Sequence, residues 1–396
     1  MTEVDGLVLL GEEFVEAKVV INKNRIETIQ IETTKENPRT EKIVIPGLIN
    51  AHTHVAMIKF RGLGVGLPTD YWLKKVIWPM ERTWTKSDVE RWSLLGIAEA
   101  VSLGSTTIND HYFFAEATAE AAKKVGVRAF IGNTVMDMVE MPGAEWSKAR
   151  NFTKRVKSEL IRPTLAPHAT NTVSKELLEE IVAFSKERNI PIHMHVAQSL
   201  EEIKWVKENY RTGPIEFLDS ISALGKEFIG VHGTYLSKKE LIKLGLTGST
   251  LIHCPTSNLL LEGKTTKPMI VAKAGGKVGL GSDSPNPVGT LDLLREAMVS
   301  SLVGTVKGAM RLAFSDVLNF GGGAIGVGRS ADLVVFNVRN TRGVGKLSLE
   351  NMPFVLSGAD VELVIVNGTV IYDNKYFPKL RKSLEDLWRD YSEQGF

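Results

Sequence analysis

The chain has 396 residues with a formal net charge of +2, and 43% of its residues are hydrophobic and 24% charged. No Lys/Arg run is interleaved with aromatic residues and no apolar run reaches membrane-spanning length, which argues against nucleic acid and membrane partners. Cys254 is the only cysteine, which excludes an internal disulfide and a cysteine-rich zinc site, and the first five residues do not begin a secretory signal, so we expect a cytoplasmic protein.

Both ends of the chain carry the alternating apolar and polar residues of short antiparallel strands. Residues 6–31 show this pattern around the turn signal Asn22-Lys23-Asn24, and it returns at residues 331–337 and 361–368. We therefore expect residues 1–45 and 329–376 to meet in one small β-sandwich. Residues 377–396 show the spacing of an amphipathic helix, which would pack on the rest of the molecule or, less favoured, form a homo-oligomer contact.

The middle of the chain, residues 46–328, alternates strand-like and helix-like segments, as parallel α/β proteins do. After a first strand running from Ile43 to Ile49, seven more are predicted: Thr106–Asn109, Arg128–Gly132, Pro163–Ala166, Pro191–Val196, Phe228–Val231, Thr250–His253 and Lys277–Gly281. Helices are predicted between most of them, including Ser87–Leu103 with Ser87 as N-cap and Glu90 completing a capping box, and Lys175–Arg188 after Ser174. Eight such units predict a (β/α)₈ TIM barrel, with chemistry at the C-terminal ends of its strands.

The first barrel strand leads into His52 and His54. Side chains two positions apart in a strand point the same way, so these two imidazoles can bind one ion together. Two core histidines satisfied by backbone groups are the alternative, and a lone His-x-His would favour it. The rest of the sequence decides for the ion.

All eight histidines lie within or just after a predicted strand, at what would be one rim of the barrel. The remaining six are His111, His168, His193, His195, His232 and His253. Asp283 follows the last strand. Three imidazoles and a carboxylate suit a borderline divalent ion, with one position left for water.

These segments, in this order, resemble the metal-dependent amidohydrolase superfamily, in particular its branch of methylthioadenosine/S-adenosylhomocysteine deaminases and triazine hydrolases. The resemblance spans nearly the whole chain. It is carried by Pro46-Gly47-Leu48-Ile49-Asn50-Ala51-His52-Thr53-His54, Ala166-Pro167-His168-Ala169, His193-Met194-His195, Val231-His232-Gly233, His253-Cys254-Pro255-Thr256-Ser257-Asn258 and Gly279-Leu280-Gly281-Ser282-Asp283.

The resemblance implies one divalent metal ion, zinc or iron, held by four side chains: His52, His54, His195 and Asp283. It also implies that His232 orients the attacking water or the substrate. Asp283 can bind the ion through one oxygen and accept the water's proton with the other. His193 is expected to be a packed imidazole or to hydrogen-bond a ligand from outside the set, and His253 to be structural or adjacent to the substrate. A buried thiol is favoured over a nucleophile at Cys254.

The substrate implied by the resemblance is a small nitrogen heterocycle. Trp72, Glu81 and His168 match positions that line the substrate pocket of the deaminases. The alternative for Trp72 is simple packing on the barrel, and for Glu81 it is a surface ion pair with Arg82 or Lys74. His111 is an added imidazole that could supply a proton, although a structural histidine there is favoured.

The sequence departs from the deaminase pattern at Gln198, where that branch has a glutamate that shuttles a proton. An amide can hydrogen-bond the substrate but cannot shuttle a proton, and loss of a general acid/base costs about 10²- to 10⁴-fold in rate. Three hypotheses follow. The first is a deaminase acting on a purine-like ring, the second a ring-amide or halide hydrolase with Asp283 as its only base, and the third a metal-containing binding protein without catalysis.

Overall fold

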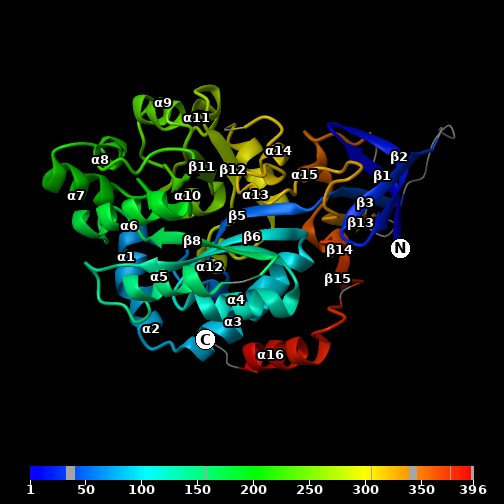
Figure 1. The fold of residues 1–396 in the computed structure, drawn as a ribbon, viewed down its shortest axis with the longest axis horizontal. Coiled ribbons are helices and arrows are strands. Elements are labelled where there is room, and N and C mark those ends of the chain that lie inside the picture. The colour runs from blue at the N-terminus through cyan, green and yellow to red at the C-terminus, as the bar shows by residue number, and fades with distance from the viewer. Residues whose placement is uncertain (33–40, 157, 305, 339–345, 375, 394–396) are drawn as a thin grey trace.

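The protein consists of an eight-stranded parallel barrel and a seven-stranded sheet built from both ends of the chain (Figure 1). The computed structural model describes residues 1–32, 41–156, 158–304, 306–338, 346–374 and 376–393. The barrel strands follow one another around the sheet in chain order: β5 (Leu48–Thr53), β6 (Ser105–Tyr112), β7 (Arg128–Val135), β8 (Ile161–Pro167), β9 (Ile192–Val196), β10 (Phe228–His232), β11 (Thr250–His253) and β12 (Lys277–Leu280). The predicted fold class is thereby confirmed, and all eight predicted strands are present.

The barrel closes between its first and last strands through residues of the predicted metal site. Thr53, at the end of β5, forms a parallel bridge with Asp283, and the Asp283 backbone N–H donates to the carbonyl of His52 at 3.0 Å. Gly281 packs against His52 so closely that an added Cβ would lie 2.9 Å from the His52 Cβ atom. The last strand is thus fastened to the first beside the site.

The segment predicted as one strand from Ile43 to Ile49 is divided between the two sheets. It breaks at Gly47 into β4 (Lys42–Pro46), in the terminal sheet, and β5, in the barrel. The Gly47 N–H donates to the carbonyl of Asp332, so the backbone changes partners there. A Cβ on Gly47 would lie 2.0 Å from Oγ1 of Thr106, which explains the glycine.

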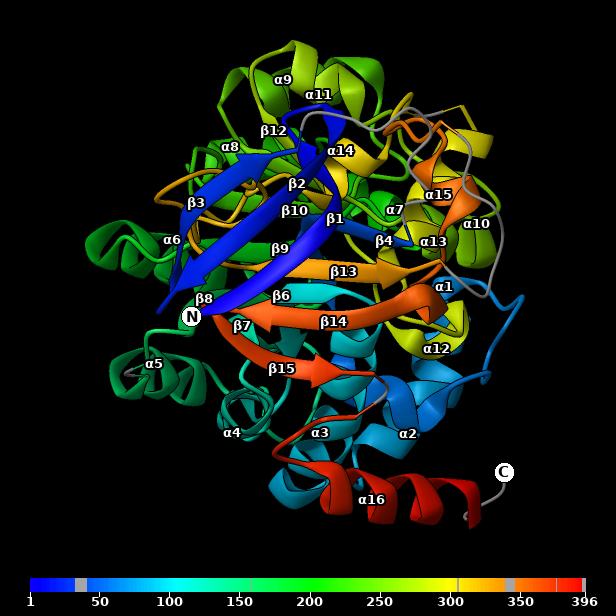
Figure 2. The same ribbon diagram turned by 90° about the vertical axis from the view of Figure 1, so that its right-hand side faces the viewer.

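The strands from the two chain ends form one continuous sheet, which Figure 2 shows nearly face on. Its order is β15-β14-β13-β4-β1-β2-β3, so β4 brings the N-terminal strands and the C-terminal strands together. The members not yet placed are β1 (Thr2–Leu10), β2 (Glu13–Asn22), β3 (Arg25–Ile31), β13 (Leu333–Asn337), β14 (Val361–Val366) and β15 (Thr369–Asp373).

Helices surround the barrel and cap one end of it (Figure 1). The connection after β5 holds a 3₁₀ helix (Val55–Phe60), α1 (Thr69–Trp72), a π-helical turn (Leu73–Ile77) and α2 (Trp78–Glu81). The other helices are α3 (Lys86–Ser102), α4 (Ala115–Val125), α5 (Trp146–Arg155), α6 (Lys175–Arg188), α7 (Leu200–Tyr210), α8 (Pro214–Ser220), α9 (Lys238–Leu246), α10 (Pro255–Glu262), α11 (Met269–Lys273), α12 (Pro285–Val288), α13 (Leu293–Leu302), α14 (Met310–Ala313), α15 (Met352–Val355) and α16 (Arg381–Glu393), with a last 3₁₀ turn at Gly358–Asp360. In the described part of the chain, none of these helices has the length and apolar character needed to cross a membrane.

The two predicted helix starts differ in outcome. α6 begins after Ser174, whose hydroxyl accepts from the Leu177 N–H as predicted. α3 begins after Thr85, which forms a capping box with Asp88, so the predicted cap at Ser87 with Glu90 is wrong. The two boxes overlap in the sequence, and the one that starts two residues earlier is formed.

The C-terminal helix α16 packs on α3 of the barrel. Asp390 forms an ion pair with Arg91, and the rings of Tyr391 and Trp92 meet edge to face with centroids 6.0 Å apart. This contact agrees with the expected packing of the C-terminal helix.

A buried ion pair joins the barrel to the terminal sheet. Arg128, the first residue of β7, donates from Nε to Asp332 Oδ2 at 2.8 Å and from Nη2 to Ser330 and Asn367. Asp332 also accepts from the Asn367 N–H at 2.6 Å. Because Arg128 opens its strand, the sheet contacts the barrel at the end opposite to the metal site.

We expect Asp332→Asn to lower the free energy of unfolding by about 3–5 kcal/mol, because it leaves the buried Arg128 guanidinium without its counter-charge. Asp219→Asn, which removes the partner of Lys243 from a solvent-exposed pair, should change it by less than about 1 kcal/mol. Urea unfolding of the three proteins gives both numbers. Equal small effects would show that the Arg128 pair does not hold the two parts together.

Candidate metal centre and active site

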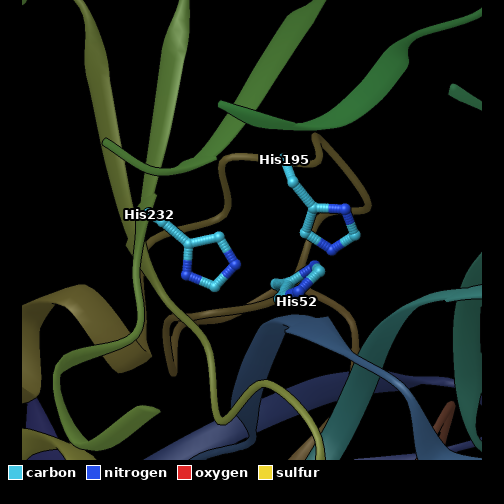
Figure 3. Close-up of side chains that lie close together, drawn as sticks. All are labelled: His52, His195 and His232. Carbon is cyan, nitrogen blue, oxygen red and sulfur yellow. The ribbon is translucent and has the colours of Figure 1, made fainter. Parts of the chain in front are cut away.

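Imidazoles from three different barrel strands converge at the C-terminal end of the barrel. His52, His195 and His232 come from β5, β9 and β10, and Figure 3 shows their rings facing a common point. The ring centroid of His52 lies 5.0 Å from that of His195 and 5.6 Å from that of His232. Nitrogen atoms of the three rings lie within 4.8 Å of one another, close enough to hold one ion.

The hydrogen bonds of His54 and His195 leave two lone pairs facing each other. His54 Nδ1 donates to the carbonyl of His111 at 2.5 Å, and His195 Nδ1 donates to the carbonyl of His168 at 2.8 Å. When both rings are neutral, neither Nε2 carries a hydrogen, and these two Nε2 atoms are 3.2 Å apart. Two acceptors at this distance repel each other unless a proton or a metal ion lies between them. Burial lowers the pKa of His54, but the hydrogen bond and charge of Asp283 outweigh burial and raise it.

The carboxylate of Asp283 lies beside both His52 and His54. Its Oδ1 lies 3.4 Å from His52 Nε2 and 3.3 Å from His54 Nε2. Ligands about 2.0–2.1 Å from a tetrahedral zinc ion are about 3.3 Å from one another, so the observed separations match such a site. Burial alone would raise the pKa of Asp283, but His52 and His54 beside it hold that pKa well below its ordinary value.

His52 is held by His193, the other histidine of β9. His52 Nδ1 lies 2.9 Å from His193 Nε2, and burial lowers the pKa of His52 to about 3. His52 Nε2 is buried and has no hydrogen-bond partner in the described structure. A proton on Nδ1, shared with His193, leaves that Nε2 free to bind an ion, so His193 is placed to orient a ligand.

His232 faces the same point but has a different environment. Its Nδ1 donates to Asn258 Oδ1 at 2.9 Å, which leaves a lone pair on the buried Nε2, and that atom has no partner among the described residues. His232 and Asp283 both have positive φ, +72° and +61°, a costly conformation for residues with a Cβ. The chain thus accepts strain at the two strand ends where these side chains enter the site.

A cavity of about 490 Å³, its open mouth included, adjoins the cluster. Metal-side residues form one wall and residues of the α1–α2 connection form the other. The lining residues are His54, Met57, Trp72, Leu73, Ile77, Trp78, Glu81, His111, Tyr112, Phe113, Thr134, His168, His195, Gln198 and Asp283.

All four residues predicted to contact the substrate line this cavity. Glu81 is 6% exposed and accepts a hydrogen bond from the Tyr112 hydroxyl at 2.6 Å, so the alternative of a surface ion pair is wrong. Trp72 is also buried, and its indole N–H donates to the carbonyl of Leu63 at 3.2 Å. Both the packing and the substrate interpretations of Trp72 therefore stand.

His168 and His111 lie beside His195, with ring centroids 4.9 and 4.6 Å from that of His195. His168 Nδ1 is 2.9 Å from the Thr172 hydroxyl, and burial lowers the pKa of His168 to about 3. His111 lies inside β6 rather than after it, and its Nδ1 is 2.9 Å from the Thr134 hydroxyl. Nitrogens of His54, His111 and His195 form a second group close enough to hold an ion, which overlaps the first.

Gln198 lines the cavity, and the acidic residues that follow it do not. The carboxylate of Glu202 accepts from the Gln198 N–H at 3.0 Å and from the Thr170 hydroxyl at 2.6 Å, while Glu201 pairs with Lys74. Neither glutamate lines the cavity, so neither replaces the missing one. His253 is fully buried at the end of β11 and belongs to none of the candidate ion-binding groups found among the described residues.

The sequence analysis did not predict the side chains that hydrogen-bond the candidate site residues. Ser257 donates its hydroxyl proton to Asp283 Oδ2, Asn258 fixes the His232 ring, and Tyr112 binds Glu81. Ser257 and Asn258 stand in the segment that carried the resemblance, so the motif itself was the signal. No pattern in the sequence marked Tyr112.

The model of the Amidohydrolase family matches residues 43–371, which is most of the chain. The chain belongs to this family. The predicted resemblance is thereby confirmed, as is the prediction of an enzyme of this hydrolase class. The histidine and aspartate cluster supports the expected single divalent metal ion.

Curated relatives match over nearly their whole length. A 5-methylthioadenosine/S-adenosylhomocysteine deaminase of Pyrococcus furiosus is 32% identical over 392 residues, covering 93% of this chain and 94% of the relative. A 5'-deoxyadenosine deaminase of Methanobrevibacter smithii is 29% identical over 425 residues, covering 97% of each.

Solved structures share the fold. An adenosine deaminase of Xanthomonas campestris with bound zinc has a TM-score of 0.90 at 24% identity, covering 99% of this chain and 98% of that one. The atrazine chlorohydrolase TrzN of Arthrobacter aurescens TC1, complexed with zinc, has a TM-score of 0.86 at 17% identity, covering 99% of each chain.

The buried Glu81 makes a prediction about stability and pH. Burial raises the pKa of Glu81 to about 7, against the hydrogen bond from Tyr112, which lowers it. A carboxyl whose pKa is higher in the folded protein than in the unfolded chain favours folding at low pH, and this contribution is lost as the pH rises toward 7. Glu81→Gln removes the titration, so the free energy of unfolding of the variant minus that of the parent should be about 2 kcal/mol larger at pH 8 than at pH 5.

Denaturant unfolding at the two pH values measures this difference, with Glu208→Gln, on an exposed side chain, as the control that should show none. The same relative stability at pH 5 and pH 8 would mean that Glu81 is ionised throughout.

The hydrogen bond from Ser257 predicts an effect on metal affinity. Ser257→Ala frees Asp283 Oδ2 to rotate, and loss of such an outer partner weakens metal binding by about 10- to 100-fold. Competition with a chromophoric zinc chelator measures the affinity. Ser220→Ala, at an exposed hydroxyl far along the chain, should leave it unchanged, and an unchanged affinity in Ser257→Ala as well would remove this role.

Proposed function

We propose that the protein is a metal-dependent deaminase that replaces the exocyclic amino group of a purine nucleoside or a related aminated ring with oxygen. The observation that carries the proposal is the convergence of His52, His54, His195 and Asp283 beside a cavity that can take a small heterocycle. The named activities of the full-length relatives support the choice of substrate.

We assign one divalent ion, zinc ahead of iron, to these four side chains. Imidazole nitrogens and one carboxylate oxygen suit either metal, and the spacing near 3.3 Å suits tetrahedral zinc. Such an ion, when bound, supplies Lewis-acid activation of water at neutral pH. Every other requirement of the reaction falls to the protein.

Asp283 can accept the proton of the attacking water, and His232 can orient that water. Asp283 is ionised, and when one of its oxygens holds the ion the carboxylate still has a lone pair that can accept this proton. His232 presents an unprotonated Nε2 to the same point because Asn258 occupies its Nδ1, so it can accept a hydrogen bond from the water and fix its direction of attack. Gln198 can donate an amide hydrogen to a ring nitrogen but holds no proton to transfer.

The other wall of the cavity binds the substrate. Trp72 offers an aromatic edge to a purine, and Glu81 offers a carboxylate to sugar hydroxyls. His111 and His168 lie at the boundary between this wall and the ligand set, where each can contact the ring. From the sequence we also propose that the protein is cytoplasmic and that the chain can self-associate.

Gln198 favours a second candidate, the hydrolysis of a ring amide or a halide with Asp283 as the only base. A halide leaves without being protonated, so such a reaction needs no glutamate at position 198. One panel of aminated and chlorinated ring compounds tests both candidates.

The decisive assay incubates the zinc-loaded protein with 5'-methylthioadenosine, adenosine, guanine, a pterin and a chlorotriazine, and measures released ammonia and chloride. We expect ammonia from an adenosine derivative, lost in Asp283→Asn. Chloride release alone would establish the second candidate. Binding of a ring compound without any product, in the parent and in Gln198→Glu, would leave only a binding protein.

Gln198→Glu should raise kcat/KM for deamination by about 10²- to 10⁴-fold, because it supplies a carboxyl that can carry the water's proton to the ring. Glu201→Gln, on the exposed face of the same turn, is the control and should change nothing. A fall in deamination on Gln198→Glu would show that the amide itself is required and would argue for a different leaving group.

A further inference from the structure

The wall of the cavity that faces the proposed metal ligands is apolar. Trp72, Leu73, Ile77 and Trp78, from the α1–α2 connection, line it together with Met57 and Phe113. Ile77 is fully buried, and Trp72 and Trp78 are 5% and 6% exposed. This wall offers a substituent of the substrate a surface of rings and aliphatic carbons.

None of the described residues that line the cavity is a lysine or an arginine. The cavity therefore offers no basic side chain to a carboxylate of the substrate. Of the basic residues in this connection, Lys74 pairs with Glu201, Arg82 donates from Nε to the carbonyl of Glu140, and the exposed Lys75 does not line the cavity.

A carboxylate brought into this cavity would lose its hydration without gaining a counter-charge from a lining side chain, and such a group is strongly disfavoured in a partly buried site.

We propose that the site selects aminopurine nucleosides whose 5' substituent is small and uncharged, and discriminates against those with an amino-acid tail such as S-adenosylhomocysteine. This rests on the proposed deaminase function and narrows it. A methylthio or deoxy group fits against Trp72, Leu73 and Ile77. The α-carboxylate of an amino-acid tail would meet no basic side chain among the described lining residues.

The test compares 5'-methylthioadenosine, 5'-deoxyadenosine and S-adenosylhomocysteine as substrates of the zinc-loaded full-length protein. We expect kcat/KM for the first two to exceed that for S-adenosylhomocysteine by at least about 10-fold, with most of the difference in KM, because the tail is distant from the reacting carbon. Equal values for all three would overturn this selectivity and leave the deaminase function intact. No turnover of any of them would count against the function itself.

A substitution that supplies the absent charge makes the test sharper. Leu73→Arg should lower KM for S-adenosylhomocysteine relative to that for 5'-methylthioadenosine, because the guanidinium can bind the tail's carboxylate. Leu73→Gln, of similar length without charge, is the matched control and should not change the ratio. Thermal unfolding confirms that both variants fold, and an unchanged ratio in a folded Leu73→Arg would contradict the proposal.

Discussion

The hydrogen bond from the Asp283 backbone to the His52 carbonyl closes the barrel and assembles the site in one contact. It fastens the last strand to the first at the residues whose side chains meet over the same point, Asp283 Oδ1 lying 3.4 Å from His52 Nε2. A barrel that failed to close would therefore also separate the side chains proposed to hold the ion. This coupling ties the geometry of the site to the stability of the whole fold rather than to a flexible loop.

The polar groups inside the barrel are arranged for a positive charge. Carbonyls of His111 and His168 hold the outer nitrogens of His54 and His195, which turns two lone pairs toward each other at 3.2 Å. His52 and His232 add buried Nε2 atoms that have no hydrogen-bond partner in the described structure. Unsatisfied acceptors cost stability when buried, so a bound cation would stabilise the folded protein as well as serve chemistry.

Strand positions and ligand types could be read from the sequence because both have short-range signatures. The apolar runs located all eight barrel strands, and histidines at strand ends located the rim. The break at Gly47 could not be read, because it depends on the contact with Thr106 and the new backbone partner Asp332. The Glu81–Tyr112 hydrogen bond and the Arg128–Asp332 pair join residues 31 and 204 positions apart, and nothing local in the sequence marks such partners.

Anomalous diffraction from crystals of the zinc-loaded protein tests the central claim most directly. We predict a single zinc peak per chain, bonded to Nε2 of His52, His54 and His195 and to Oδ1 of Asp283 at about 2.0–2.2 Å. A zinc peak centred instead between His54, His111 and His195, away from Asp283, or no peak at this rim, would contradict the account.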